Sequence, residues 1–286
     1  MKEVQKVDNL SYKDFVKNFV EPGIPVVFKN ASKAWKANGL FTPEYFRKNF
    51  GDRRTTVSGK EYSISEMLDL IEKSSAENPA PYPCKFNVHV ELPELLPLLH
   101  PLNMNYAQPN YFENTRLFPA QKWGNDLEVF LGGPGGKFPF AHIDYYHTNA
   151  WITQVYGEKN FVVFPPGQDK YMYATQEGPW KSPVNIFNPD YEKHPEFKHA
   201  TPITVKLEPG ETIFVPNGTW HTAESLTPGI SIVYDQLTRS NFKNWFNDLW
   251  VEKKQGGKLK SIAFMAYALG ARSIFEIRYA LKSKKN

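Results

Sequence analysis

The sequence contains a single cysteine, Cys84, among its 286 residues. One thiol cannot form a disulfide within the chain, and it cannot build a cysteine-based zinc site. No apolar run approaches the roughly 18 to 20 residues that a membrane-spanning helix needs. The first residues also lack the apolar stretch of a secretory signal peptide, so we expect a cytoplasmic protein, or a nuclear one if the source is a eukaryote.

The chain also has little net charge, no internal repeat and no low-complexity segment. The net charge is +4, with 41% apolar and 22% charged residues, a balance that indicates a folded globular protein. Residues 240–286 hold ten Lys and Arg against three Asp and Glu, which leaves −3 for the rest of the chain. A basic segment can contact nucleic acid, but a solvated helical face is the simpler interpretation, so we expect no nucleic-acid partner.

Residues 1–120 show helical and extended patterns in turn, and we expect a mixed region that packs on a core. Apolar residues recur at helical spacing after Ser11, and the Thr42-Pro43 pair and Gly51 are placed as the two ends of a second helix. The expected elements are helices at 12–20, 43–50 and 63–73 and a buried strand at 24–28.

Residues 121–239 change character, because short runs of β-branched and aromatic residues alternate with Gly and Pro turns. Such runs predict an antiparallel sandwich or barrel in which every second side chain points inward. The polar, Pro-rich insert 172–200 is expected to be a surface loop that exposes His194 and His199. Residues 240–286 carry two further helical patterns, so the predicted fold class is mainly β with helices at both ends.

Two histidines and one carboxylate form the strongest candidate site. His142 and Asp144 are two positions apart in "FAHIDYYH", so on a strand both would project to the same face. A buried carboxylate needs a partner or a metal, and His221 begins another strand pattern that could lie opposite. Two His and one carboxylate are the facial triad of non-haem Fe(II) oxygenases. By itself, however, His-x-Asp is more often a plain hydrogen-bonded pair than a metal site.

Lys159 is a further candidate, because it stands in a strand pattern that otherwise predicts buried core, just after Gly157. Lysine is rarely fully buried without a partner. An anionic ligand inside the barrel would explain its position, and so would an edge strand whose lysine reaches solvent.

Several ordered segments together carry a resemblance to a known family: "HID", "GEKNFVVFPP", "NPDYEKHPEF", "LEPGETIFVPNGTWH" and "GISIVYDQL". From about residue 125 to 240 the chain resembles the JmjC, or cupin-like, Fe(II)- and 2-oxoglutarate-dependent oxygenases, most of all the branch of small protein hydroxylases. The resemblance implies a double-stranded β-helix, or jelly-roll, whose Fe(II) is held by His142, Asp144 and His221. It also implies that Lys159 pairs with the distal carboxylate of 2-oxoglutarate.

Three positions depart from the family pattern. Pro139 stands where members often have a threonine that helps to hold 2-oxoglutarate, and Ile152 stands where some have a polar contact. Asp235 stands where many members have an asparagine, and an added carboxylate there could alter substrate preference or cofactor affinity. These departures leave the iron ligands intact and leave the other contacts to 2-oxoglutarate open.

Polar residues near the first two ligands are the remaining candidates. We expect Asn149 and Thr153 to help bind 2-oxoglutarate, with Thr148 as a nearby alternative. His147 and Asp235 are candidates for substrate contact, although a plain loop histidine is the more common role for a residue such as His147.

The resemblance implies hydroxylation of a C–H bond, and the family favours a side chain in a protein or peptide as substrate. A free amino acid or other small metabolite is the first alternative, and N-methyl demethylation uses the same chemistry. A non-catalytic cupin binding protein and a zinc hydrolase fit less well, because all three ligands and Lys159 are present together. The apolar residues of 240–286 further predict a homodimer through these helices, with packing on the chain's own barrel as the alternative.

Overall fold

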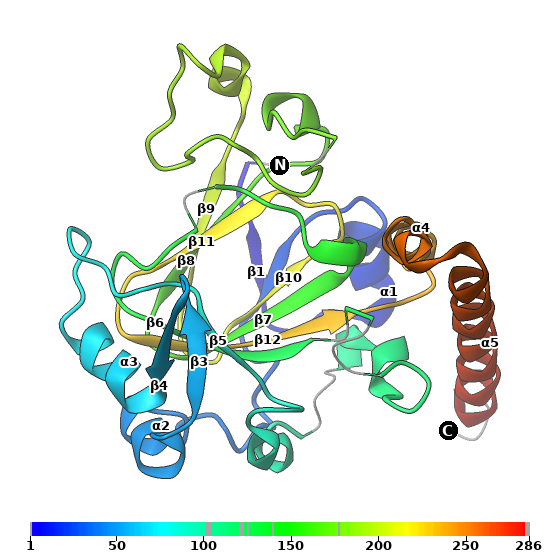
Figure 1. Cartoon of the computed structure of the whole chain (residues 1–286), viewed down its shortest axis with the longest axis horizontal. Helices are drawn as coiled ribbons and strands as arrows, with labels where there is room; N and C mark the ends of the chain where they lie inside the picture. Colours follow the sequence, from blue (N-terminus) through cyan, green and yellow to red (C-terminus); the bar gives the residue numbers. More distant parts are fainter. Residues whose placement is uncertain are drawn as a thin grey trace.

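The computed structural model describes residues 2–100, 105–119, 123–124, 126–138, 140–176 and 178–283. A major sheet and a minor sheet face each other at the centre, and helices and loops cover their outer faces (Figure 1). This arrangement confirms the predicted jelly-roll with helical additions.

The strand order in the major sheet is β1 (Gln5–Val7), β2 (Val26–Phe28), β10 (Thr212–Val215), β7 (Asn149–Tyr156), β12 (Gly229–Gln236), β6 (Leu127–Gly132) and β5 (Cys84–Asn87). The minor sheet consists of β11 (His221–Ser225), β8 (Lys159–Val163) and β9 (Ile203–Leu207). A separate hairpin joins β3 (Arg54–Val57) to β4 (Lys60–Ser63). All strand pairs are antiparallel except β1 with β2, which are parallel.

Side-chain alternation along β7 decides which residues enter the space between the sheets. Ile152 belongs to the apolar cluster that joins the two sheets, together with Phe161 of β8 and Ile213 of β10. Trp151 points to the opposite face, where its ring lies 5.7 Å from that of Phe15 in the N-terminal region. Because successive side chains of a strand face opposite sides, the even-numbered residues of β7 face inward and the odd-numbered ones outward.

The N-terminal helices cover the outer face of the major sheet. They are α1 (Tyr12–Phe15), which a π-helical turn continues over Val16–Val20, α2 (Pro43–Phe50) and α3 (Ile64–Glu72). Side-chain caps explain where they begin, since Ser11 accepts from the N–H of Asp14, and Ser63 and Glu66 form a reciprocal capping box. These elements confirm the helices predicted at 12–20, 43–50 and 63–73.

Short 3₁₀ helices connect the larger elements, at Pro93–Leu98, Asn105–Ala107, Tyr111–Glu113, Tyr145–His147, Asp169–Tyr171, Pro195–His199 and Lys254–Gly256. The predicted boundary between 1–120 and 121–239 falls at residues outside the described part of the chain. Strands β1, β2 and β5 of the first segment hydrogen-bond into the major sheet, so the N-terminal region and the core share one sheet.

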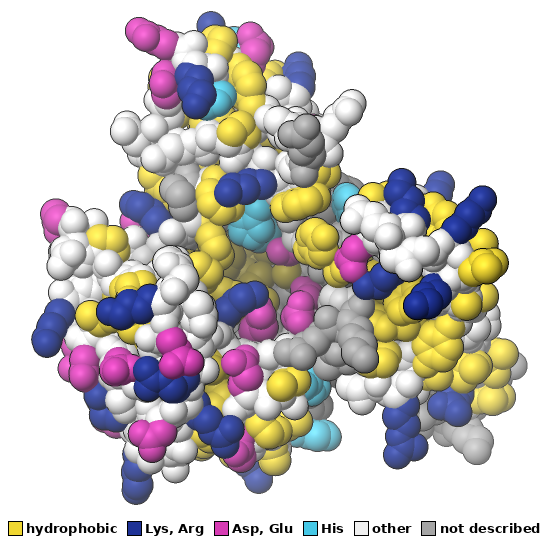
Figure 2. All heavy atoms as spheres, in the orientation of Figure 1, with side chains coloured by type: hydrophobic (Ala, Val, Ile, Leu, Met, Phe, Trp, Pro, Cys, Tyr) yellow, Lys and Arg dark blue, Asp and Glu magenta, His cyan; other side chains and the backbone are white. Residues whose placement is uncertain are grey.

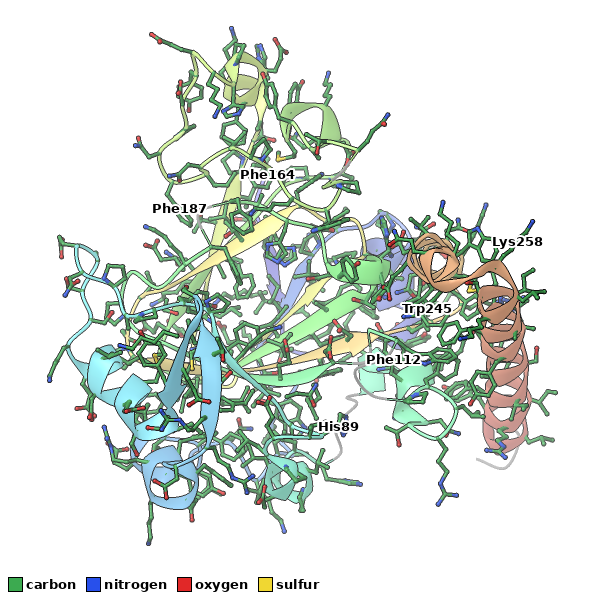
Figure 3. The ribbon with its side chains drawn as sticks, in the orientation of Figure 1. His89, Phe112, Phe164, Phe187, Trp245 and Lys258 are labelled. Carbon is green, nitrogen blue, oxygen red and sulfur yellow. The ribbon has the colours of Figure 1, made fainter. Side chains whose placement is uncertain are left out.

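The two predicted C-terminal helices are α4 (Phe242–Lys253) and α5 (Lys258–Ser283). They have an apolar cluster of their own, in which Trp245 of α4 is fully buried and lies beside Phe112 (Figure 3). The ring of Trp245 stacks on Trp123 at 5.7 Å and its Nε1–H donates to the carbonyl of Trp123 at 2.8 Å. None of the described helices is both long and apolar enough to cross a membrane.

The insert 172–200 is less loop-like than its composition predicts. Val184 and Phe197 pack with Phe164 and Trp220 in a small apolar cluster above the minor sheet. The expectation that His194 is exposed is wrong, since only 7% of it is accessible and its ring lies 5.0 Å from that of Tyr173. Apolar residues spread among prolines and charged residues show neither helical nor strand periodicity, and therefore this packing cannot be predicted from the sequence.

Candidate metal centre and its cavity

A cavity of about 250 Å³ opens between the two sheets. Figure 2 shows its mouth as a hollow in the middle of one face, with histidine and carboxylate side chains on its floor. The three predicted ligands and Lys159 all line this cavity. The structure therefore brings together residues that lie up to 79 positions apart, from 142 to 221.

Backbone pairing sets the two histidines side by side. The N–H of each donates to the carbonyl of the other at 2.9 Å, in an isolated antiparallel bridge between His142 and His221. The expectation that His142 and Asp144 lie within one regular strand is wrong. His142 makes only single bridges, to His221 and to Lys181 of the insert, and Asp144 precedes a 3₁₀ turn. Both side chains nevertheless reach the same point of the cavity.

The donor atoms of the triad converge closely enough to share one ion. The ligand atoms of His142, Asp144 and His221 all lie within 4.8 Å of one another. Oδ1 of Asp144 is 4.0 Å from Nε2 of His142 and 3.7 Å from Nε2 of His221. Two imidazole nitrogens and one carboxylate oxygen are the donor set of a facial triad.

The protonation of the histidines suits metal binding. Nδ1–H of His221 donates to the carbonyl of Thr219 at 3.0 Å, which leaves the lone pair on Nε2, the nitrogen nearer Asp144. Burial, together with the neighbouring His221, holds the pKa of His142 well below its ordinary value, so this ring is neutral. Burial raises the pKa of Asp144 although His221 opposes the shift, and a cation at this point would stabilise the carboxylate. The residues therefore fit Fe(II).

Lys159 lies deeper in the same cavity. Its position depends on Gly157, whose φ of +70° and whose approach to the carbonyl of Pro228 leave no room for a Cβ, which would stand 2.0 Å from that oxygen. The residue is 4% exposed, and its Nζ donates to the hydroxyl of Ser231 at 2.9 Å. Burial lowers the pKa of Lys159 to about 8. Among the described residues no carboxylate pairs with it, so the ammonium suits an anionic ligand.

The structure places Asn149 and Thr153 away from the cavity. Both have odd numbers in β7 and therefore point to the outer face with Trp151. The Asn149 amide bonds with Gln236 and Asn217, and the Thr153 hydroxyl lies 2.8 Å from that of Thr212. Neither is among the described residues that line the cavity, so we assign neither a contact with 2-oxoglutarate.

The other polar candidates separate clearly. Thr148 and Asp235 line the cavity, and the Thr148 hydroxyl donates to Asp235 at 3.2 Å. His147 turns away from the cavity, and its Nδ1 lies 2.6 Å from Oδ2 of Asp248 on α4. Ile152 lines the cavity as an apolar side chain, and Pro139 lies outside the described residues.

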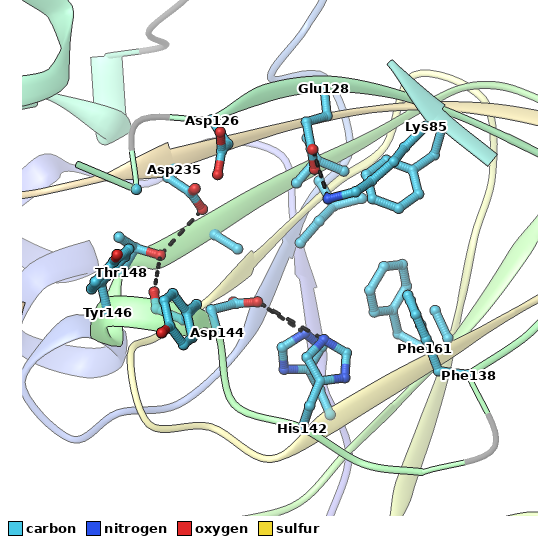
Figure 4. A pocket seen from close by; sticks show the side chains of 18 of the residues that line it. Lys85, Asp126, Glu128, Phe138, His142, Asp144, Tyr146, Thr148, Phe161 and Asp235 are labelled. Atoms are coloured by element: carbon cyan, nitrogen blue, oxygen red, sulfur yellow. Dashed lines mark hydrogen bonds and ion pairs between the residues drawn. The ribbon is translucent and has the colours of Figure 1, made fainter. Parts of the chain in front are cut away.

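Two acidic residues and one lysine of the cavity wall were not predicted from the sequence: Asp126, Glu128 and Lys85. Figure 4 shows Asp126, Glu128 and Asp235 directed into the cavity, with Lys85 paired to Glu128 at 2.7 Å. Asp126 directly precedes β6 and Asp235 is the last residue but one of β12, and these two strands are neighbours in the major sheet. Polar residues alternating with apolar ones, as in "DLEVF", normally predict a solvent-facing strand surface, so this pattern does not indicate an acidic cavity wall.

These carboxylates are held close to one another in a poorly hydrated place. Burial, with Asp126, Asp144 and Glu128 nearby, raises the pKa of Asp235 well above its ordinary value, against the hydrogen bond from Thr148. Burial also raises the pKa of Asp126, against Lys85 and His89. Lys85 is paired with Glu128, so the described wall has more acidic than basic groups.

A jelly-roll that gathers two imidazoles and a carboxylate in its mouth defines a cupin-type metal protein. The comparisons with known proteins agree. The family model for the Cupin-like domain matches residues 12–240, and the chain belongs to this family. It is 26% identical to the arginine-specific demethylase JMJ22 of Arabidopsis thaliana over 246 residues, which cover 84% of this chain and 47% of the relative.

Two further relatives extend the similarity. The chain is 26% identical to the 2-oxoglutarate and iron-dependent oxygenase JMJD4 of Mus musculus over 280 residues, covering 87% of this chain and 64% of the relative. It is 33% identical to human HSPB1-associated protein 1 over 141 residues, which cover 43% of this chain and 28% of the relative. The chain thus spans less than two thirds of these relatives. They confirm the resemblance to JmjC-type oxygenases and the predicted cofactor pair, Fe(II) and 2-oxoglutarate.

Proposed function

We propose that this protein is an Fe(II)- and 2-oxoglutarate-dependent oxygenase that hydroxylates a C–H bond in a side chain of a protein or peptide. The observation that carries the proposal is that one cavity is lined both by the His142, Asp144 and His221 triad and by Lys159, a buried lysine with no carboxylate partner among the described residues. When bound, the two cofactors supply the oxidation of a C–H bond by O₂, with conversion of 2-oxoglutarate to succinate and CO₂.

The residues of the chain would divide the work by position. His142, Asp144 and His221 would hold Fe(II), and Lys159 would bind the distal carboxylate of 2-oxoglutarate. Tyr82 also lines the cavity, with its ring centre 5.7 Å from Nζ of Lys159, and its hydroxyl could share the contact. Apolar wall residues, among them Ile152 and Phe161, exclude water from the space between these groups.

The charge of the cavity wall favours a cationic substrate group. Fe(II) and Lys159 would together balance Asp144 and the two carboxylates of 2-oxoglutarate, and Lys85 balances Glu128. Asp126 and Asp235 remain, and a guanidinium or ammonium group would give them the partner that buried carboxylates need. A basic side chain of a protein is therefore the substrate class that we propose. The name of JMJ22, an arginine-specific demethylase, is compatible with this choice.

Two alternatives use the same site. A basic free amino acid or another small metabolite would also fit a cavity of about 250 Å³. Demethylation of an N-methyl group begins with the same hydroxylation. A non-catalytic binding protein is disfavoured, because the complete ligand set and Lys159 are present together.

The test is turnover of 2-oxoglutarate by the purified chain loaded anaerobically with Fe(II) and then exposed to O₂. Succinate formation, stimulated by peptides with basic side chains and accompanied by a mass increase of one oxygen, is expected. No succinate above the metal-free control would contradict the proposal. Loss of a methyl mass from a methylated peptide would favour demethylation instead.

We also propose a homodimer built from residues 240–286. The support is an exposed apolar face of α5, which includes Leu259, Ile262, Leu269 and Ile277, with accessible fractions between 47% and 84%. The opposite face of α5 packs on the chain's own cluster through Met265, Ala268, Ala271 and Phe275. A second copy would cover the first face by two-fold pairing, the commonest arrangement of soluble oligomers.

A further inference from the structure

The turn that follows Asp144 has an unusual backbone. Tyr146 has φ 57° and ψ 20°, and His147 has φ 49°. Both are in the left-handed region, which residues with a Cβ rarely adopt and which two successive bulky residues adopt only where their surroundings hold them. The N–H of His147 donates to the carbonyl of Asp144 at 3.2 Å, so the turn is joined directly to the metal-ligand residue.

Helix α4 supplies the groups that hold this turn. Nδ1 of His147 is 2.6 Å from Oδ2 of Asp248, and the hydroxyl of Tyr146 donates to Oε2 of Glu252. Asp248 and Glu252 are four residues apart, so they lie on the same face of the helix. The side chain of Asn241, just before α4, donates to the carbonyl of His147 at 3.1 Å. Three side chains of the C-terminal segment thus fix two consecutive residues of the turn.

The helix and the turn are themselves fixed from behind. Trp245 buries its ring and bonds to the carbonyl of Trp123, which ties α4 to the loop before β6. The ring of Tyr146 packs directly over Gly124, where an added Cβ would stand 2.6 Å from Cδ2 of the tyrosine. Tyr146 therefore lies between Gly124 on one side and Glu252 on the other.

We propose that α4 is a clamp for the metal centre, in which Asp248 and Glu252 are positioning residues that keep the carboxylate of Asp144 directed at the two imidazoles. The proposal rests on the proposed function, because it assumes that the triad binds a metal. The clamp lies beyond residue 240, where the match to the family model ends. A part of this chain outside the matched domain therefore completes its metal site.

The physical reason is the free-energy cost of the left-handed backbone conformation at Tyr146 and His147. Without its two carboxylate partners, the backbone at Tyr146 and His147 relaxes toward right-handed or extended conformations. Such a change rotates the chain next to Asp144, and a displacement of about 1 Å is enough to spoil a site of this kind. Asp248 and Glu252 bond to His147 and Tyr146 of the turn, and neither bonds to the side chain of a described metal ligand. Their effect on the metal site therefore passes through the turn, whose Tyr146 also lines the cavity.

The test compares Asp248→Asn, Glu252→Gln and the double variant with the unaltered full-length chain. Co(II), which replaces Fe(II) and is stable in air, is titrated into the metal-free proteins, and affinity and the visible absorption spectrum are recorded. We expect the double variant to bind Co(II) at least tenfold more weakly and with a changed spectrum. Asp248→Glu, which keeps the carboxylate, should recover most of the affinity. Val251→Ala, at a 53% exposed position of the same helix, is the matched control and should leave both readouts unchanged.

The outcomes separate a positioning role from general stabilisation. Circular dichroism and thermal unfolding of the metal-free variants report whether α4 still docks. A lower melting temperature with unchanged Co(II) affinity and spectrum would mean that the carboxylates only stabilise the fold, and this would overturn the proposal. An unaltered chain that binds no Co(II) would instead refute the proposed function, and the clamp with it.

Discussion

The ammonium nitrogen of Lys159 lies 2.9 Å from the hydroxyl oxygen of Ser231, and this hydroxyl donates to the amide oxygen of Gln154 at 2.7 Å. The charge is thus buried against neutral partners between the sheets. An apolar residue at this position would make the fold more stable, because burying an ammonium group without a charged partner opposes folding. A dianionic cofactor reverses that balance, which makes Lys159 the most informative residue for experiments.

Replacing Lys159 by methionine should selectively weaken the binding of 2-oxoglutarate. Loss of one partner of a buried pair costs roughly 3 to 5 kcal/mol, so the apparent KM for 2-oxoglutarate should rise on the order of a hundredfold or more. Metal affinity should change little, since Lys159 contacts none of the three ligands. Lys206→Met, an exposed lysine on β9 that pairs with Glu158, is the matched control. An unchanged KM in Lys159→Met would show that another group binds the distal carboxylate.

The same substitution should stabilise the chain when 2-oxoglutarate is omitted. Burial lowers the pKa of Lys159 from 10.5 to about 8, so between these pH values the native chain binds fewer protons than the unfolded chain. Its free energy of unfolding therefore rises with pH across this window, and below pH 8 the buried charge costs about 3 kcal/mol. Lys159→Met should gain up to that amount at pH 7 and lose the pH slope. Urea unfolding at pH 7 and pH 9.5 measures both; a less stable variant at pH 7 would contradict the prediction.

The affinity for 2-oxoglutarate should decline in alkaline solution. Only the protonated form of Lys159 pairs with a carboxylate, and its pKa near 8 places the loss of charge in an accessible range. Binding of the dianion raises this pKa, so the decline should be gradual from about pH 8 upward. Calorimetric titration of 2-oxoglutarate into the Co(II)-loaded chain at several pH values tests this. Affinity that stays constant up to pH 10 would argue against a lysine contact.

Removal of the acidic ligand should abolish metal binding while the fold survives. Asp144→Ala takes away the only charged ligand, and because outer partners of ligands alone are worth about 10- to 100-fold, turnover should drop below about 1%. The apolar cluster between the sheets does not include Asp144, so circular dichroism should be unchanged. Asp52→Ala, at an exposed position, controls for loss of a negative charge. Full 2-oxoglutarate decarboxylation by Asp144→Ala would refute the site.

The acidic wall should control which substrates are accepted. Charge-assisted hydrogen bonds are worth about 1.5 to 3 kcal/mol, so Asp235→Asn and Asp126→Asn should each raise the KM of a basic peptide about ten- to a hundredfold. The KM for 2-oxoglutarate should be far less affected. Glu196→Gln, an exposed residue of the insert, is a suitable control. Equal effects on basic and neutral peptides would contradict a cationic substrate.

The predicted dimer depends on the exposed face of α5. Ile262→Glu with Ile277→Glu places charges on that face without touching the buried one, so a dimer should become a monomer by light scattering at micromolar concentration. Tyr267→Glu alone, on the flank of the face and 47% exposed, should have a smaller effect. A monomeric mass for the unaltered chain would exclude the dimer.

The iron ligands could be predicted because their signal is local. His142 and Asp144 are two positions apart, and His221 follows a recognisable turn, so short motifs carry the chemistry. Lys159 stood out because a lysine interrupts an apolar strand. The jelly-roll itself was predictable for the same reason, since alternation and Gly/Pro turns are properties of short windows.

The choice of strand face could not be predicted. In β7 both Trp151 and Ile152 are apolar, so the pattern does not say which of them faces the cavity. For this reason Asn149 and Thr153 are expected at the cavity from the sequence, although their side chains face the outer side of the sheet. Asp126 and Glu128 look like a solvated strand surface for the same reason. Which face is interior is decided by what packs on it from elsewhere in the chain, as is the contact of α4 with His147.

The strand order of the major sheet has a consequence for the order in which the molecule is made. β2 lies next to β10, with Val27 opposite Ile213, so the first strands to leave the ribosome wait for partners from the last third of the chain. Non-local pairings of this kind form slowly and late. His142 can pair with His221 only after residue 221 has been synthesised. The turn beside Asp144 acquires its partners later still, after α4 has been synthesised. The metal centre therefore acquires its geometry only after α4 has been synthesised, and a shorter nascent chain offers iron an incomplete or poorly positioned set of ligands.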